Sequence, residues 1–157
     1  MYMQRIIKEI DLIIKDFPEW DLKIDERNAS EWILSFPGAS DTIYEKYLIE
    51  LKIKIPLCFP IDPPLIFINH QNFFHPNVDY NNGNICLSVL KKSGYYPHCW
   101  SSIMHIYQIV LTISSLLVDS QITMNQINPN AANLYLNDRE TYDKKVIEWL
   151  EKFCVKI

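Results

Sequence analysis

The spacing of hydrophobic and polar positions predicts a helix at the start of this chain. Between residues 2 and 16 apolar residues recur every three or four positions, which is typical of an amphipathic helix that ends before Pro18. Its apolar side consists of Ile6, Ile7, Ile10, Ile13, Ile14 and Phe17. The polar positions are Gln4, Arg5, Lys8, Asp11 and Lys15. This polar face is either ordinary solvated surface or a docking face for a partner.

A different pattern, rich in β-forming residues, predicts the strands. The runs lie at 20–25, 31–37, 47–56 and 65–68. The third run alternates apolar and charged residues from Ile49 onward, as expected for a strand with one buried and one solvent-exposed face. Between the third and fourth runs, four prolines force an extended, turn-rich segment. An antiparallel meander is the simplest way to connect the four strands.

The second half of the chain is predicted to be mainly helical. Ser101 and Ser102 precede an apolar-rich run from 103 to 118, which indicates a largely buried helix with a serine at its N-cap. Residues 130–136 favour a short helix. Asn137 or Asp138 then caps a final helix from 139 to about 155. Its inner face consists of Tyr142, Val146, Trp149, Leu150 and Phe153.

Together these elements predict one α+β domain over residues 1–157. The order is an N-terminal helix, a four-stranded antiparallel meander sheet, an irregular loop, a long central helix and two C-terminal helices. On folding, a chain of 157 residues buries roughly 70% of the surface that it exposes when unfolded. Its hydrophobic core can therefore be stable without a structural metal ion or disulfide bonds. The sequence contains no repeat, low-complexity tract or linker.

Charge and cysteine content narrow the function classes. A net charge of −4 does not favour binding to the negatively charged backbone of nucleic acid. The sequence also contains no run of about 18 apolar residues, the length needed to span a membrane. The four cysteines, at positions 58, 86, 99 and 154, lack CxxC spacing, and the N-terminus lacks a signal peptide's apolar region. We therefore expect free thiols in a reducing compartment, cytoplasmic or nuclear.

The stretch from Phe73 to Trp100 carries the candidate chemistry. Pro76 bends the chain within His75-Pro76-Asn77, and the turn-forming run at 81–84, Asn-Asn-Gly-Asn, supplies a second bend. Between such bends the Asn77 amide and the Cys86 thiol can face each other. An exposed thiol can exchange with an activated acyl group, and an amide can stabilise the resulting oxyanion. The alternative is a small buried cysteine and an asparagine that only forms a turn.

The same stretch resembles the ubiquitin-conjugating enzymes, and the resemblance covers nearly the whole chain. The active-site signature is matched by His75-Pro76-Asn77 followed by Gly83-Asn84-Ile85-Cys86-Leu87. Supporting matches are the first helix at 5–9, Trp32 and Phe36-Pro37-Gly38, the turn at 44–47, Phe59-Pro60-Ile61-Asp62-Pro63-Pro64, Trp100 with the helix after it, and 138–142.

This resemblance implies roles for individual residues. Cys86 would accept the C-terminus of ubiquitin or a ubiquitin-like modifier as a thioester, and Asn77 would stabilise the transition state when a substrate lysine attacks. His75, with Pro76, would hold the loop rather than act as a base. Family members often have an aspartate beside the site, where this chain has Met124-Asn125. Asn125 could orient an amine by hydrogen bonding but could not favour its loss of a proton electrostatically.

The resemblance also implies partners. Arg5 and Lys8 would contact the activating enzyme, whereas Ile61, Ser102 and Ile103 would form a ligase-docking surface. No cofactor or metal is expected in this chain, because ATP is used by the activating enzyme. The other expected partners are the modifier and a protein that carries the substrate lysine.

Three departures from the family pattern stand out. Lys46 and Tyr47 replace small residues at the turn after the second strand, so that hairpin must close differently. One extra residue separates Asn77 from Cys86. The Cys-to-Trp spacing is longer by about six residues than in the simplest members, through the segment 91–99. This insertion and Ala131-Ala132 resemble a branch that conjugates the NEDD-type modifier.

Other functions remain possible from the sequence. A cysteine protease would need His75, His98 or His105 as the base beside Cys86, but no protease signature surrounds the thiol. A zinc site could use Cys86, His98, Cys99 and His70 or His75, without the usual paired spacing. Cys99 could form a disulfide with Cys86, although a free thiol is preferred. A catalytically inactive adaptor of the same fold is the remaining alternative; such adaptors lack the active-site cysteine.

Overall fold

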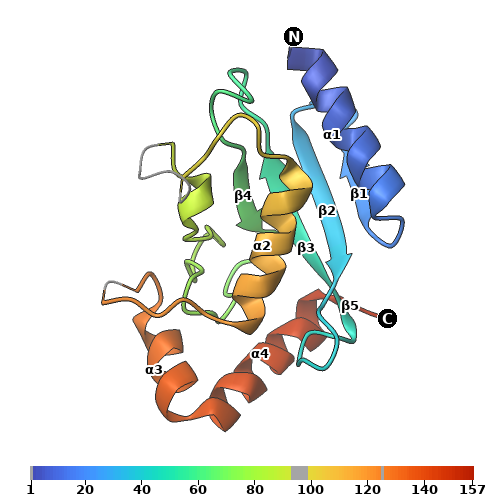
Figure 1. The fold of residues 1–157 in the computed structure, drawn as a ribbon. Coiled ribbons are helices and arrows are strands. Elements are labelled where there is room, and N and C mark those ends of the chain that lie inside the picture. The colour runs from blue at the N-terminus through green and yellow to red at the C-terminus, as the bar shows by residue number, and fades with distance from the viewer. Residues whose placement is uncertain (1, 93–98, 125) are drawn as a thin grey trace.

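A computed structural model describes residues 2–92, 99–124 and 126–157 and shows helices packed against an antiparallel sheet (Figure 1). The first half contains α1 (Tyr2–Asp16), β1 (Asp21–Ile24), β2 (Glu31–Pro37), β3 (Tyr47–Lys54) and β4 (Leu65–Ile68). The second half contains a short 3₁₀ helix (Ser88–Leu90), α2 (Ile106–Val118), α3 (Pro129–Asn137), α4 (Arg139–Phe153) and β5 (Val155–Lys156). The α+β prediction is confirmed.

The sheet is an antiparallel meander in the order β1-β2-β3-β4, as predicted. In the register, Leu34 lies opposite Leu51, and Ile53 lies opposite Ile66 on the next strand. Alternate residues of β3 are buried, which accounts for the alternation of apolar and charged residues in its sequence. The helix α2 lies against one face of this sheet, while α3 and α4 lie at the end opposite the N-terminus of α1 (Figure 1).

The sheet has one strand more than predicted. Val155 and Lys156 form β5, which pairs with Leu48 and Tyr47 at the start of β3. The prediction of helix to about Val155 is therefore wrong at its end, because α4 stops at Phe153. Two residues of strand give too short a pattern to be read from sequence, and their partner lies about a hundred residues earlier in the chain.

The connection between β2 and β3 closes without a tight two-residue turn. The Gly38 amide donates to the Tyr47 carbonyl at 3.0 Å, and the Tyr47 amide donates to the Tyr44 carbonyl at 3.0 Å. A Cβ on Gly38 would lie 2.0 Å from the Tyr44 carbonyl oxygen, so only glycine fits there. The hairpin thus closes differently from a short turn, as predicted, through a loop that folds back on Gly38.

The helix α1 is confirmed, but its inner face differs from the prediction. Ile6 and Ile13 are buried, whereas Ile7 and Ile14 are 54% and 61% exposed. Glu9 is fully buried on the inner face. The apolar stripe of α1 is broader than the surface that the rest of the fold covers, so two of the isoleucines predicted to be buried face solvent.

The central helix begins later than predicted. Its N-cap is His105, whose backbone amide donates to Gln108 Oε1 at 2.8 Å. Ser102 and Ile103 lie in a turn before it. The predicted cap of α4 is confirmed as Asp138, whose side chain accepts from the Thr141 amide. In the part of the chain that the structure describes, no helix is long and apolar enough to span a bilayer.

Candidate active site

Two chain segments that pair in antiparallel fashion position the candidate thiol. The Val78 amide donates to the His75 carbonyl at 3.2 Å, which closes the first predicted bend. The second bend is closed by the Gly83 amide, which donates to the Asp79 carbonyl at 2.9 Å; Gly83 has φ +75°. Across the second bend, the Cys86 backbone amide donates to the Asn77 carbonyl at 2.7 Å. Both predicted bends are therefore confirmed. They pair Asn77 with Cys86 through the backbone, while the Asn77 side-chain amide, predicted to face the thiol, is bonded to Gln121.

The Cys86 side chain is exposed and lines a groove of about 190 Å³. Other residues lining this groove include Leu65, Leu90, Lys91 and Ile127. Leu65 is 54% exposed, so the groove presents apolar surface beside the thiol. An exposed thiol on a backbone fixed by hydrogen bonds can accept an acyl group from outside the protein. The alternative of a buried structural Cys86 is therefore wrong.

His75 is completely buried beneath this hairpin. The backbone amide of Asn77 donates to Nδ1 of His75 at 3.1 Å. The other ring nitrogen, Nε2, therefore carries the proton, and it faces the Leu116 carbonyl at 3.2 Å. Ser120 Oγ lies 3.0 Å from the same Nε2. Burial lowers the pKa of His75 to about 4, which keeps the ring neutral near pH 7. Both ring nitrogens are occupied, so His75 cannot serve Cys86 as a base.

The Asn77 side chain faces the segment that follows α2. Its Nδ2 donates to the Gln121 carbonyl at 2.7 Å, and its Oδ1 accepts from the Gln121 amide at 3.0 Å. Asn77 is only 5% exposed. Nδ2 carries two N–H groups, and the second has no protein acceptor among the described residues. Sequence reasoning missed Gln121 and Ser120, because no local pattern indicates which distant backbone an asparagine or histidine will contact.

Two predicted features lie partly or wholly outside the described residues. Asn125, predicted to orient the incoming amine, is one of them. The insertion at 91–99 is described only at Lys91, Lys92 and Cys99, so His98 is also outside. Cys86 is a free thiol in the structure and forms no disulfide with Cys99. No group of three or more His, Cys, Asp or Glu residues within 2–92, 99–124 and 126–157 could hold a metal ion.

The residues predicted to dock a ligase come together on adjacent loops. Ile61 and Ile103 are 70% and 72% exposed, and Ser102 is also exposed. Trp100 joins the two loops, because its Nε1 donates to the Pro60 carbonyl at 2.9 Å. Ile61 and Ile103 therefore present exposed apolar side chains on two loops that the Trp100–Pro60 hydrogen bond holds together. Its role in docking stays a prediction.

The two residues predicted to dock the activating enzyme differ in exposure. Lys8 is exposed, whereas the Arg5 guanidinium donates to Glu9 Oε1 and to the Met104 carbonyl, both at 2.6 Å. Glu9 also accepts from His105 Nδ1 at 2.9 Å and from the Ile106 amide at 2.9 Å. Arg5 thus belongs to a buried network that ties α1 to the start of α2. A charged residue between Ile6 and Ile13 on the apolar stripe was the sequence signal for this network.

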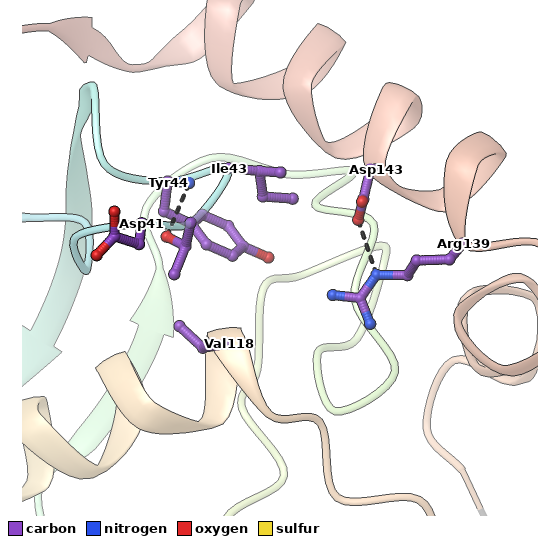
Figure 2. A pocket seen from close by; sticks show the side chains of 7 residues that line it. Asp41, Ile43, Tyr44, Val118, Arg139 and Asp143 are labelled. Atoms are coloured by element: carbon purple, nitrogen blue, oxygen red, sulfur yellow. Dashed lines mark hydrogen bonds and ion pairs between the residues drawn. The ribbon is translucent and has the colours of Figure 1, made fainter.

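A larger cavity, of about 410 Å³, lies between the loop after β2, the end of α2 and the start of α4 (Figure 2). Figure 2 shows the Tyr44 ring and the Arg139 guanidinium reaching into it. Arg139 Nε lies 2.9 Å from Asp143 Oδ1, so the guanidinium in this cavity is already paired with a carboxylate. Cysteine is not among its lining residues, and acyl-transfer chemistry therefore points to the smaller groove at Cys86.

Comparison with known proteins places this geometry in a family. The family model described as ubiquitin-conjugating enzyme matches residues 5–150. Ubiquitin-conjugating enzyme E2 5 of Arabidopsis thaliana is 27% identical over 148 residues, which cover 94% of this chain and 76% of that protein. Ubiquitin-conjugating enzyme E2-24 kDa of Saccharomyces cerevisiae is 32% identical over 139 residues, covering 87% of this chain and 60% of that protein.

Solved structures agree with the family model. A Plasmodium yoelii protein assigned as a ubiquitin conjugating enzyme superposes with a TM-score of 0.82 and 30% identity, covering 99% of this chain and 97% of that one. The E2 domain of a Toxoplasma gondii ubiquitin conjugating enzyme has the same TM-score at 24% identity, covering 99% and 100%, and shows the fold alone. The family model spans nearly all of the sequence and includes the hairpin with Asn77 and Cys86. The chain belongs to the ubiquitin-conjugating enzyme family.

Proposed function

We propose that this chain accepts ubiquitin or a ubiquitin-like modifier as a thioester on Cys86 and transfers it to a substrate lysine. The observation that carries the proposal is the exposed Cys86 thiol, held by a backbone hydrogen bond to Asn77 in a chain of this family. In the first step the modifier's activated C-terminal carbonyl moves from the activating enzyme to the Cys86 sulfur. In the second, a lysine amine attacks that carbonyl and the thiol leaves.

Asn77 supports the second step in this proposal. One N–H of its amide holds the Gln121 carbonyl, and the other is available to donate to the oxyanion that forms at the thioester carbon. His75 contributes by holding the backbone of Asn77 through its Nδ1, while its neutral ring stays out of proton transfer. ATP is consumed by the activating enzyme, so this chain needs no cofactor of its own.

The partners follow from the surfaces beside this site. We assign activating-enzyme docking to α1 with Lys8 as an exposed cation, and Arg5 as a partly buried support for that helix. We assign ligase docking to the exposed Ile61, Ser102 and Ile103. The reducing cytoplasm or nucleus is the proposed location, because it keeps the Cys86 thiol reduced.

The modifier is proposed to be ubiquitin, because both curated relatives are named as ubiquitin-conjugating enzymes. The insertion at 91–99 keeps the NEDD-type modifier as the second candidate, and one experiment compares the two. Purified chain is incubated with ATP, the matching activating enzyme and each modifier, and the products are run on a non-reducing gel. We expect a thiol-sensitive adduct with the wild type. Cys86→Ser is expected to give at most a thiol-resistant ester.

A thiol-sensitive adduct that persists in Cys86→Ser would place the thioester on another cysteine. Cys58→Ser is the matched control, because Cys58 is a second exposed free thiol away from the groove. Absence of any adduct with either modifier would favour the alternative, an inactive adaptor of the same fold.

A further inference from the structure

Another groove, of about 290 Å³, lies between α4 and the segment 72–80. It shares no lining residue with the groove at the candidate thiol. One wall is formed by Phe74 and Tyr80, and Tyr80 is 46% exposed. The other wall is the C-terminal half of α4, which contributes Trp149 and Phe153. The groove therefore presents aromatic side chains that the candidate active site does not use.

Hydrogen bonds and ring packing fix both walls of this groove. The Asn72 amide donates to the Tyr80 carbonyl at 2.8 Å, which closes the loop between them. On α4, Trp149 Nε1 donates to the Gln71 carbonyl at 2.9 Å, and the Trp149 ring packs edge-on against Phe73 with centroids 4.6 Å apart. Trp149 is only 7% exposed and forms the floor. Because the walls are already held in place, a ligand pays little for ordering them on binding.

The charges along the groove alternate in sign. Lys145, Glu148 and Lys152 are exposed and follow one another on the side of α4 that lines the groove. The Lys145 ammonium lies 5.5 Å from the Phe74 ring centroid, and the Lys152 ammonium lies 4.9 Å from that of Phe153. Neither lysine is ion-paired with any residue that the structure describes. Two cations beside aromatic rings are thus available to a ligand, with a carboxylate between them.

This charge pattern selects among negatively charged ligands. Lys145 and Lys152 are seven positions apart on α4, about 10 Å along a helix, and an extended peptide covers that distance in about three residues. Two carboxylates three residues apart in a peptide can therefore reach both ammoniums, while an apolar side chain between them packs on the rings. Glu148 repels a third negative charge at the centre, which disfavours the closely spaced phosphates of nucleic acid.

We propose that the groove between α4 and the segment 72–80 binds an acidic peptide segment of a partner protein, in which two carboxylates flank an apolar residue. Lys145 and Lys152 bind the two carboxylates. Tyr80 contacts the apolar side chain, and Glu148 selects against a further negative charge between them. The groove acts by binding alone, so the inference does not depend on the thioester chemistry proposed above.

The test measures the binding of a defined peptide to the whole chain by fluorescence anisotropy. The probe is a fluorescein-labelled peptide with the core Asp-Phe-Gln-Asp between Gly-Ser flanks. The double variant Lys145→Glu and Lys152→Glu should weaken binding about tenfold or more, because two attractive charge pairs become repulsive. The matched control is Lys144→Glu, which changes an exposed lysine of the same helix that does not line the groove. It should change the affinity by less than about twofold.

A second comparison tests the carboxylate at the centre of the groove. A probe with the core Asp-Phe-Glu-Asp carries one more negative charge, and the wild type should bind it about threefold more weakly than the first probe. Glu148→Gln should remove this difference. Circular dichroism verifies that each variant is folded.

Four results would overturn the inference. These are no binding of the first probe to the wild type below about 1 mM, equal weakening by Lys144→Glu, an unchanged preference between the probes in Glu148→Gln, or tighter binding of a single-stranded oligonucleotide than of the peptide. Since none of these measurements uses a modifier or an activating enzyme, their failure leaves the proposed function untouched.

Discussion

The buried His75 makes the stability of this fold depend on pH in a defined direction. Burial lowers its folded-state pKa to about 4, against roughly 6.5 in an unfolded chain. The unfolded state therefore binds the proton more tightly, and between these pH values it carries the proton that the folded state lacks. The stability from a neutral His75 is fully present above about pH 6.5 and is lost as the pH falls toward 4.

The size of the effect follows from the gap between the two pKa values. A gap of about 2.5 pH units corresponds to about 3 kcal/mol in the free energy of unfolding, and about 2 kcal/mol of this is lost by pH 5. Urea unfolding followed by tryptophan fluorescence at several pH values between 7 and 5 measures that loss. His75→Gln, which cannot be protonated in this range, is the comparison.

Carboxylates titrate in both proteins and cancel in the difference between them. His75→Gln is expected to be less stable than the wild type at pH 7, because the bonds of Nδ1 and Nε2 are disturbed. Its stability should nevertheless fall less steeply on acidification, by about 2 kcal/mol at pH 5. An equal slope in wild type and variant would show that the folded His75 binds protons like an exposed histidine, and would refute the argument.

Three further predictions concern other parts of the fold. Glu9→Ala should lower the free energy of unfolding, measured in urea, by about 3 kcal/mol, because Arg5 and the Ile106 amide lose the buried carboxylate to which they donate. The control, Asp11→Ala at an exposed position of the same helix, should change it by less than about 0.5 kcal/mol. Gly83→Ala should cost about 2 kcal/mol in thermal unfolding and slow thioester formation, because a Cβ would lie 2.4 Å from a β4 carbonyl at positive φ. Asn81→Ala, a change to an exposed side chain of the same turn, should do neither. Asn77→Ala should slow discharge to free lysine by roughly 10²- to 10³-fold and slow charging less; equal slowing of both would make it a structural residue.

Much of the fold was readable from local sequence pattern. The alternation along β3, the N-cap of the last helix and the two bends before Cys86 depend on residues close together in the chain. Such features follow from backbone preference and side-chain periodicity, which neighbouring residues decide among themselves. The backbone pairing of Asn77 with Cys86 follows in the same way from short-range turns, whereas the predicted approach of the Asn77 side-chain amide to the thiol does not, because that amide is bonded to Gln121.

The remaining features required contacts between distant segments. The tertiary structure decided that Glu9 is buried at the start of α2, that β5 pairs with β3, and that the Asn77 amide holds Gln121. It also decided that Lys91 borders the thiol groove while its neighbour pairs with Asp62. The sequence by itself determined the local features, namely the strand alternation, the helix cap and the two bends that precede Cys86. The partners of the polar residues depended on packing, because a polar side chain binds whichever distant group the folded chain brings within reach.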